Sequence, residues 1–222
     1  MKKVVVVLSG GMDSATTLYQ AIKDGFDPYT ISFNYGQRHK KELDYAKELC
    51  ENISINHKVV DITNLTEVIN KSALTNADID VPEGHYAQEN MKITVVPNRN
   101  MIMYSIAIGY AVNIGALAIY VGVHSGDHAI YPDCRPEFIS ELDKIAKIAN
   151  EGFIAEDFTV KAPFLNKTKA DIVRIGHELN VPYELTWSCY KGGKEHCGKC
   201  GTCVERMEAF ELAKIKDPTL YE

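Results

Sequence analysis

Six consecutive residues near the N-terminus have the types and the spacing of a phosphate-binding turn. Residues Ser9 to Ser14, with the sequence SGGMDS, offer two hydroxyl groups, two glycines and one carboxylate. Glycines let a phosphate approach the backbone, and the free amides and positive dipole of a helix N-terminus attract an anion. The Asp13 carboxylate repels a bare phosphate, but it is a suitable ligand for magnesium that accompanies phosphates. The turn therefore predicts a site for magnesium and a polyphosphate.

The segments on either side of this turn are those that such a site requires. Val4 to Leu8 is an uninterrupted apolar run, typical of a central strand in a parallel sheet with both faces covered. Apolar residues recur at helical spacing from Ala15 onward, so we expect a helix directly after the turn. The residues predicted to contact the nucleotide are Leu8, Ser9, Gly10, Gly11, Met12, Asp13, Ser14, Ala15, Thr16, Thr17 and Leu18.

Two common phosphate-binding motifs are excluded by this sequence. The Walker pattern needs a lysine before a serine or threonine at a fixed distance from the glycines, and none is present at that spacing. The dinucleotide fingerprint G-x-G-x-x-G is not matched either. An ordinary glycine turn with a Ser or Asp helix cap remains the alternative interpretation.

A cysteine cluster near the C-terminus has the spacing of a metal site. Four of the six cysteines follow the pattern C-x7-C-x2-C-x2-C, at Cys189, Cys197, Cys200 and Cys203. Two-residue spacers let successive thiolates turn toward one ion, and four thiolates with no open position are typical of structural zinc. An iron–sulfur cluster is the rival, but the ferredoxin run needs a proline after its last cysteine, and Val204 follows here.

The remaining two cysteines have no such pattern. Cys50 is predicted to pack in the core from a helix, and Cys134 lies in a loop without a paired base that would identify it as a nucleophile.

A second predicted strand, 29–33, also ends in polar residues. The segment Asn34 to His39 leaves its carboxyl end, where ligands bind in open α/β sheets. We expect Arg38 to face a phosphate or carboxylate and Tyr35 to flank a ring, with a solvated surface arginine as the equal alternative for Arg38. A third short strand is expected at 58–62, before a weak helix that reaches about residue 71. Residues 73–92 have no clear period and are predicted to form a long mobile loop, for which a lid over the site is one interpretation.

An apolar helix is expected over 101–114, with Pro97 in its first turn and Asn98 and Asn100 as capping residues. Arg99 at this helix N-terminus opposes the helix dipole, which favours an anionic ligand beside it.

The loop after the next predicted strand, 116–123, is rich in polar and aromatic side chains. Carboxylates in it can accept hydrogen bonds from the N–H groups of a guanine-like edge, while aromatic rings can stack on the base. The predicted substrate-binding residues, together with Tyr35, are Asp127, Tyr131, Asp133, Glu137 and Phe138. Turn and helix-start chemistry is the alternative for Asp133 and Glu137.

Further cations are expected near the same rim of the sheet. Lys161, Lys167 and Lys169 follow or end a short strand at 158–162, and one of them is expected to neutralise triphosphate charge. Arg206 lies on a helix that begins near Thr202, and we expect it to point toward the mouth of the pocket. The predicted catalytic residues are Asp13, Arg38, Arg99, Lys161 and Arg206. A solvated side chain is the alternative for each cation.

Length and composition limit the classes of protein that the chain can represent. Its 222 residues suit one α/β domain over 1–222, with a small zinc-binding appendage at 186–206. The net charge of −6 argues against stable binding of a long nucleic acid. No apolar run is long enough to span a membrane and no signal-peptide pattern is present, so we expect a cytoplasmic location.

Taken together, the turn at 9–14, the segments 34–39, 97–100 and 127–138, residues 163–169 and the four cysteines resemble the QueC family of PP-loop ATP pyrophosphatases. This resemblance covers the whole chain in order. It implies an adenine nucleotide alpha hydrolase-like fold: a doubly wound, mostly parallel α/β sheet with a C-terminal four-cysteine zinc knuckle. It also implies one structural zinc per chain and a homodimer.

The activity implied by the resemblance is conversion of 7-carboxy-7-deazaguanine and ammonia to 7-cyano-7-deazaguanine, a queuosine precursor, with ATP and magnesium. The acid is adenylated, ammonia gives the amide, and a second adenylation on the amide oxygen permits elimination to the nitrile. Two other classes stay open at this point. One is a PP-loop enzyme that adenylates a tRNA base for thiolation or lysidine formation, and the other is a binding module without turnover.

Overall fold

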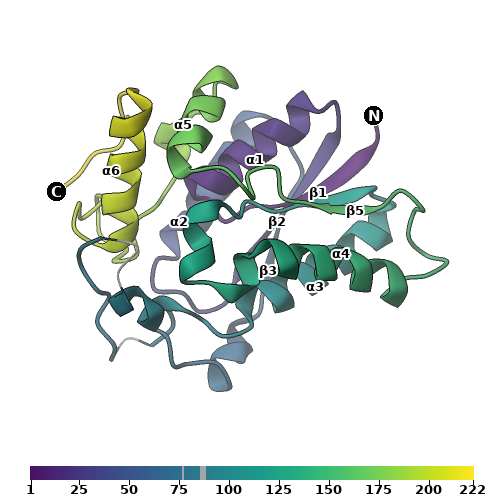
Figure 1. The fold of residues 1–222 in the computed structure, drawn as a ribbon, viewed down its shortest axis with the longest axis horizontal. Coiled ribbons are helices and arrows are strands. Elements are labelled where there is room, and N and C mark those ends of the chain that lie inside the picture. Colours follow the sequence, from purple (N-terminus) through teal and green to yellow (C-terminus); the bar gives the residue numbers. More distant parts are fainter. Residues whose placement is uncertain (77, 86–88) are drawn as a thin grey trace.

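The computed structural model describes residues 1–76, 78–85 and 89–222, and its centre is a five-stranded parallel sheet (Figure 1). The strands are β1 (Lys3–Val7), β2 (Asp27–Asn34), β3 (His57–Asp61), β4 (Ala118–Tyr120) and β5 (Thr159–Lys161), in the spatial order β3-β2-β1-β4-β5. Every neighbouring pair is parallel. The predicted mostly parallel α/β sheet is confirmed.

Helices cover both faces of the sheet, as the uninterrupted apolar strands require. The helices are α1 (Met12–Lys23), α2 (Lys41–Asn52), α3 (Arg99–Ile114), α4 (Pro136–Ala149), α5 (Lys169–Glu178) and α6 (Gly201–Ala213). Short 3-10 turns occur at Thr63–Glu67, Glu89–Thr94, Ser125–Ala129, Pro132–Cys134 and Tyr183–Leu185.

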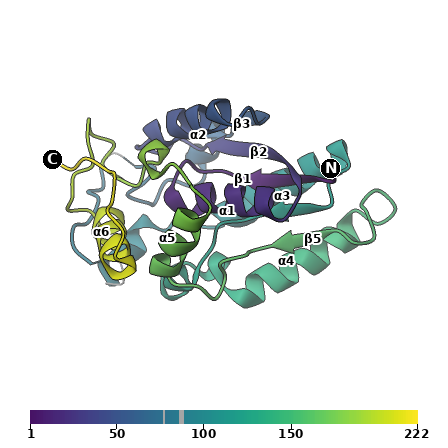
Figure 2. The same cartoon turned by 90° about the horizontal axis from the view of Figure 1, so that it is seen from above.

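Two apolar clusters cover the sheet, one on each face, and a third, smaller cluster surrounds the clustered cysteines. Val5 points toward α3 and α4, whereas its neighbours Val4 and Val6 pack with α1, α2, α5 and α6. This alternation follows from the two-residue period of a strand. Helix α6 and the C-terminus lie at one end of the molecule, and the N-terminus lies toward the other (Figures 1 and 2).

The strand order creates a crevice beside β1. From β1 the chain winds outward to β2 and β3, then returns past β1 and winds in the other direction to β4 and β5. Loops that leave β1 and β4 therefore diverge, and ligands bind at such a switch point. Gly122, just after β4, lets α1 approach this edge, because a Cβ there would lie 3.1 Å from the Ser14 backbone.

Several local predictions differ from the structure. The predicted strand 116–123 is paired only over Ala118–Tyr120, and the weak helix before residue 71 is a single 3-10 turn at Thr63–Glu67. In the predicted long loop, residues 77 and 86–88 lie outside the described residues. Ala73, Leu74 and Met91 in its described part are buried in the apolar clusters, so these positions are packed against the domain.

The start of α3 also differs from its prediction. Pro97 precedes the helix, which begins at Arg99 after Asn98 in the left-handed conformation (φ 61°), and the Asn98 side chain makes no capping hydrogen bond. Asp133 supplies the cap instead, because its Oδ2 accepts a hydrogen bond of 3.1 Å from the Asn100 backbone N–H. A partner 33 residues away cannot be found from local sequence.

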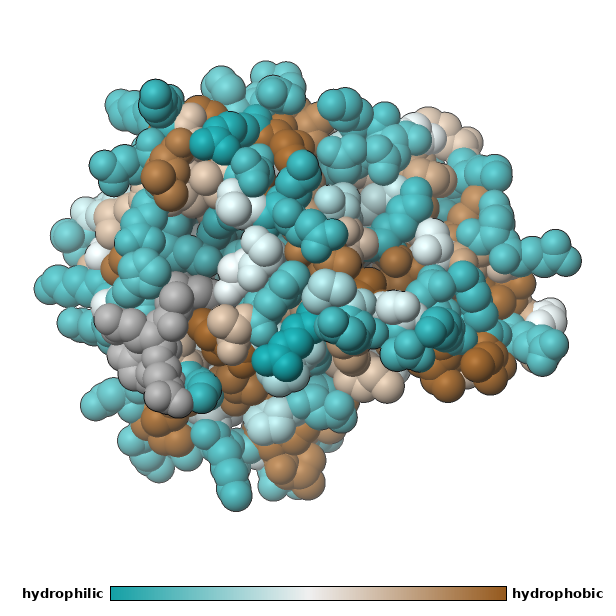
Figure 3. Space-filling model, in the orientation of Figure 1, coloured by the Kyte–Doolittle hydropathy of each residue, from teal (hydrophilic) through white to brown (hydrophobic). Residues whose placement is uncertain are grey.

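In the part of the chain that the structure describes, no helix has the length and apolar character needed to cross a bilayer. Hydrophilic residues cover most of the face seen in Figure 3, and apolar residues form scattered patches between them.

Candidate active site

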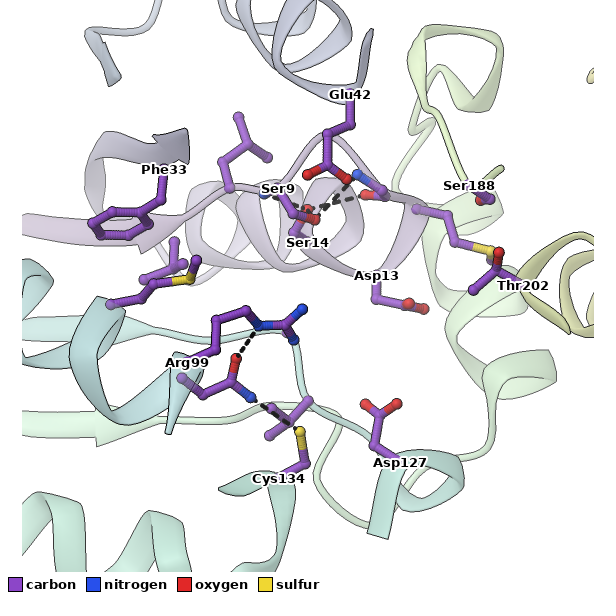
Figure 4. Close-up of a pocket in the computed structure, with 18 of the residues that line it drawn as sticks. Ser9, Asp13, Ser14, Phe33, Glu42, Arg99, Asp127, Cys134, Ser188 and Thr202 are labelled. Atoms are coloured by element: carbon purple, nitrogen blue, oxygen red, sulfur yellow. Dashed lines mark hydrogen bonds between the residues drawn. The ribbon is translucent and has the colours of Figure 1, made fainter. Parts of the chain in front are cut away.

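A cavity opens at the carboxyl ends of β1, β2 and β4, at the switch point of the sheet (Figure 4). The turn after β1 forms one wall, and residues from the β2 loop, the start of α3 and the β4 loop form the opposite wall. One cavity therefore joins the predicted phosphate site to the predicted substrate segments.

The turn after β1 is held rigid by its own serines. The two hydroxyl oxygens of Ser9 and Ser14 are 3.0 Å apart, Ser14 Oγ donates to the Gly11 carbonyl, and the Gly11 N–H donates to Ser9 Oγ. Gly10 has a φ of +91°, and a Cβ there would lie 2.0 Å from the Glu42 carbonyl oxygen. Only glycine fits at that position.

Part of the predicted nucleotide set lines the cavity. Leu8, Ser9, Gly11, Met12, Asp13 and Ser14 do so. Gly10 packs against α2, and the four residues that follow Ser14 point into the protein from the first turns of α1: Ala15, Thr16, Thr17 and Leu18 are fully buried. These four residues anchor α1 in the core and so support the turn, but they lie behind the predicted site and do not line it.

A compact charge network lies beside the turn. Lys169 Nζ is 2.6 Å from Glu205 Oε2 and 3.2 Å from Asp13 Oδ2. His124 Nε2 lies 3.8 Å from Asp13 Oδ2 and 3.6 Å from Asp127 Oδ2, and its Nδ1 accepts a hydrogen bond from the Gly126 N–H. That bond places the ring hydrogen of neutral His124 on Nε2, facing the two carboxylates.

Burial and charge act in opposite directions on this network. Burial lowers the pKa of Lys169, but the carboxylates of Asp13, Glu205 and Asp127 outweigh it and raise that pKa well above its usual range. Burial also raises the pKa of Glu205, against the opposing effect of Lys169. Asp13 Oδ1 is buried and makes no hydrogen bond. An unsatisfied carboxylate oxygen beside a phosphate loop suits a hard cation such as magnesium.

The opposite wall combines a guanidinium group with tyrosines. Arg99 points into the cavity toward the side on which Asp13 and Asp127 lie (Figure 4), with its guanidinium carbon 5.7 Å from the centre of the Tyr35 ring. Its Nε donates to Asn100 Oδ1 at 3.2 Å. Among residues 1–76, 78–85 and 89–222, no acidic side chain forms an ion pair with Arg99. Burial raises the pKa of Tyr35 to about 12, so its hydroxyl is neutral.

The predicted substrate residues separate into two groups. Tyr35, Asp127 and Tyr131 line the cavity. Asp133 is turned toward the α3 N-terminus that it caps, and Glu137 is exposed in the first turn of α4. Phe138 packs into the core with its ring 6.4 Å from that of Tyr104. For Asp133 and Glu137, the turn and helix-start alternative describes the structure better.

Three predicted catalytic cations do not line the cavity. Arg38 is exposed and donates to the Ile79 carbonyl at 2.7 Å. Lys161 lies over the rings of Phe26 and Tyr120 and donates to the Tyr120 hydroxyl, which itself donates to Asp24 at the far end of α1. Of the three lysines expected near this rim, Lys169 lines the cavity.

Arg206 is fully buried behind the site, so the prediction that it points toward the pocket mouth is wrong. Its Nε and Nη2 each lie 3.1 Å from an Asp217 oxygen, and it also donates to Thr186 Oγ1 and to the Tyr183 carbonyl. An arginine with all these partners holds α6 against the preceding loop and has no donor directed at a ligand.

Several lining residues were missed in the sequence. They include His39, Glu42, Tyr104, Trp187, Ser188, Tyr190 and Thr202. Trp187 and Tyr190 flank the first clustered cysteine, and Thr202 lies between the last two. Because the Trp187 N–H donates to the Gly10 carbonyl at 2.9 Å, the cysteine segment is attached directly to the phosphate turn. The one sequence feature that indicates a role for this segment in the site is the single tryptophan of the chain, two residues before Cys189.

The four clustered cysteines form a candidate metal centre. One sulfur from each of Cys189, Cys197, Cys200 and Cys203 lies within 4.8 Å of all the others, and no disulfide joins them. Backbone N–H groups of Lys199 and Cys200 donate to the Cys197 sulfur. Cys200 is also the N-cap residue of α6. The donor set is a closed sulfur tetrad of the kind that holds a structural metal.

The doubly wound parallel sheet with a glycine–serine turn at its switch point agrees with the PP-loop fold that the sequence resemblance implies. Residues 3–214 match the family model described as queuosine biosynthesis protein QueC, and the chain belongs to this family.

Full-length relatives agree with the family. The chain is 52% identical over 221 residues to a 7-cyano-7-deazaguanine synthase from Psychromonas ingrahamii, covering 100% of this chain and 98% of that protein. It is 53% identical over 220 residues to a protein of the same name from Brucella anthropi, covering 99% and 94%. These names do not favour the tRNA-modifying alternative.

Among solved structures, the chain is similar to an NH3-dependent NAD synthetase from Campylobacter jejuni, with a TM-score of 0.49 and 16% identity. That alignment covers 82% of this chain and 66% of the synthetase.

Proposed function

We propose that this chain converts 7-carboxy-7-deazaguanine and ammonia to 7-cyano-7-deazaguanine at the expense of ATP. The observation that carries the proposal is the single cavity in which the phosphate turn faces Arg99, a guanidinium with no acidic partner in the described chain. Such a cavity suits a reaction between a carboxylate and the α-phosphate of a nucleotide. The full-length relatives named for this synthase support the choice of substrate.

In the first proposed step, an oxygen of the substrate carboxylate attacks the α-phosphorus of ATP and pyrophosphate leaves, which gives an acyl adenylate. The turn at 9–14 holds the phosphates through backbone N–H groups and the Ser9 hydroxyl, and Lys169 neutralises part of their charge. Arg99 holds the substrate carboxylate in line with the phosphorus. These residues act by positioning and by stabilising charge.

In the later steps, ammonia displaces AMP from the acyl adenylate to form the amide. The amide oxygen then attacks a second ATP at its α-phosphorus and pyrophosphate leaves; loss of AMP with two protons from the adenylated amide gives the nitrile. We assign recognition of the deazaguanine ring to Asp127, whose carboxylate can accept hydrogen bonds from ring N–H groups, and to the rings of Tyr35 and Tyr131. A nucleophilic cysteine is not needed.

Two metals belong to the proposal. Magnesium would be held by Asp13 together with the phosphates, and it would withdraw charge from the leaving pyrophosphate. Zinc would be held by the four cysteines as a structural ion. A tetrahedral zinc with bonds of about 2.3 Å requires sulfurs about 3.8 Å apart, which fits the spacings of 3.5 Å for Cys200 to Cys203 and 4.0 Å for Cys197 to Cys203.

We also propose a cytoplasmic homodimer, on the resemblance to the family alone. Sedimentation velocity of the purified protein measures the oligomeric state directly, and a monomer at micromolar concentration would contradict this part of the proposal.

The function is tested by mass spectrometry of a reaction that contains the protein, ATP, magnesium, ammonium and 7-carboxy-7-deazaguanine. The proposal requires the nitrile and two AMP for each product. Cleavage of ATP to AMP without the nitrile would retain the PP-loop chemistry and reject the substrate. A folded, zinc-loaded protein that gives neither product would reject the enzyme.

A further inference from the structure

Lys169 lies where two physical effects oppose a positive charge. It is the first residue of α5, whose N-terminus carries the positive end of the helix dipole, and its side chain is only 13% exposed. A lysine in such a place stays charged only if carboxylates surround it. The structure supplies Asp13 at 3.2 Å and Glu205 at 2.6 Å.

The two carboxylates are not equivalent when ATP is bound. This step rests on the proposed function, in which Asp13 turns to magnesium and the phosphates. Lys169 then keeps Glu205 as its close ion-pair partner. Glu205 comes from α6 and is itself only 13% exposed, so the pair is shielded from solvent and from competing salt.

Glu205 is anchored from outside the phosphate site. It lies one helical turn after Thr202, which lines the cavity, so both side chains occupy the same face of α6. The next residue, Arg206, ties α6 to Asp217 and Tyr183. The helix begins at the cysteine cluster, with Cys200 as its N-cap residue. The position of the Glu205 carboxylate is therefore set by α6 and does not depend on the phosphate turn.

We propose that Glu205 is a positioning residue that holds the Lys169 ammonium group over the phosphate turn, ready to meet the phosphates of ATP. Glu205 touches no reacting atom. Its contribution is the location of the lysine, so its removal should weaken nucleotide binding and leave the remaining substrates unaffected.

The test compares Glu205→Gln, Glu205→Asp and Lys169→Ala with the wild-type protein. Affinity for a non-hydrolysable ATP analogue with magnesium is measured by calorimetry, and KM values are measured for ATP and ammonium. Glu205→Gln should raise the dissociation constant and the KM for ATP about tenfold, since the ion pair with Lys169 is replaced by a weaker hydrogen bond to a neutral amide oxygen. The KM for ammonium should stay within twofold. Glu205→Asp keeps the charge but has a shorter side chain, so its dissociation constant and its KM for ATP should lie between those of wild type and Glu205→Gln.

Glu208 provides a matched control on the same helix. It is 42% exposed and contacts His85 at 3.2 Å, away from the cavity, so Glu208→Gln should bind the analogue like wild type. A merely structural role for Glu205 would lower the melting temperature without a selective change in the KM for ATP.

A double-mutant cycle completes the test. In the Lys169→Ala background, Glu205→Gln should have no further effect on nucleotide affinity, because the lysine that it positions is gone. Equal or tighter binding by Glu205→Gln in the wild-type background would overturn the inference, and tighter binding would mean that Glu205 competes with the phosphates for Lys169. Absence of nucleotide binding by the wild-type protein would instead reject the proposed function, and the inference with it.

Discussion

Arg99 and Arg206 show two opposite uses of a guanidinium group in one small protein. Arg206 is fully buried and has an acidic partner, two hydroxyl partners and a carbonyl partner. Arg99 projects into the cavity (Figure 4), and among the residues that the structure describes its hydrogen-bond partners are a neutral amide and a tyrosine hydroxyl. A guanidinium whose donors are all satisfied stabilises the fold, whereas one whose donors face a cavity is available to an anionic ligand.

The comparison predicts that disturbing the Arg206 region costs stability. Asp217→Asn should lower the free energy of unfolding by about 3 kcal/mol, because a buried guanidinium loses its counter-charge. Denaturant unfolding measures the change. Asp157→Asn is a suitable control, since Asp157 forms only an exposed pair with Lys2 at 3.6 Å and should change stability by less than about 0.5 kcal/mol. Equal losses in the two variants would refute the structural role of Arg206.

The ion pair between Arg206 and Asp217 should make the stability lost in Asp217→Asn depend on pH. Burial of Asp217 would raise its pKa, but the hydrogen bonds and charge of Arg206 outweigh burial and lower it. A carboxyl with a depressed folded pKa stabilises the protein above its unfolded pKa of about 3.9, and this contribution disappears as the pH falls through the folded value. The difference in stability between wild type and Asp217→Asn should therefore narrow in acid below about pH 4.

Substitution of Arg99 should affect substrate binding and leave the stability of the fold almost unchanged. Arg99→Ala should raise the KM for the carboxylate substrate roughly 10- to 100-fold, the value of one or two charged hydrogen bonds, while unfolding stability changes by less than about 1 kcal/mol. Arg99→Lys should not restore activity, because a lysine lacks the planar fork of donors. Steady-state kinetics with each substrate varied in turn provide the measurement, and an unchanged KM for the acid would assign Arg99 to another ligand.

The smallest effects are expected at two cations that contact neither region. Arg38→Ala and Lys161→Ala should each leave kcat/KM for ATP and for the acid within about twofold, since Arg38 is exposed and Lys161 lies at the far end of α1. Replicate steady-state kinetics of each purified variant beside the wild type measure differences of this size. A tenfold loss in either variant would mean that the site closes around it when substrates bind.

These cases also show what the sequence could and could not predict. The parallel sheet was predictable because runs such as Val4 to Leu8 have a local apolar pattern, and the turn at 9–14 was predictable because its residues are contiguous. The direction of a long side chain depends on packing between distant elements. Arg99 lines the cavity and Arg206 is buried behind it, although both are cations near the start of a helix for which the sequence predicts a place at the pocket.

Other parts of the site were missed for the same physical reason. Glu205 and Lys169 are 36 residues apart and meet only because α5 packs on α6. The sequence indicates that one lysine of this region faces the phosphates. It does not distinguish Lys169 from Lys161, because the direction of each side chain depends on how the helices pack at the rim of the sheet. Trp187 reaches the turn only through the cysteine segment that folds back onto Gly10.

The cap that Asp133 provides for α3 has a consequence for the order in which the protein folds. Asn98 does not cap α3, so the first turn of that helix gains its side-chain cap only when the segment after β4 has docked. Closing this contact requires the intervening helix and β4 to be in place, which is a loop closure of more than 30 residues and costs entropy before it gains stability. We therefore expect the wall that carries Arg99 to be completed late, after the β1–α1 unit with its phosphate turn has already formed.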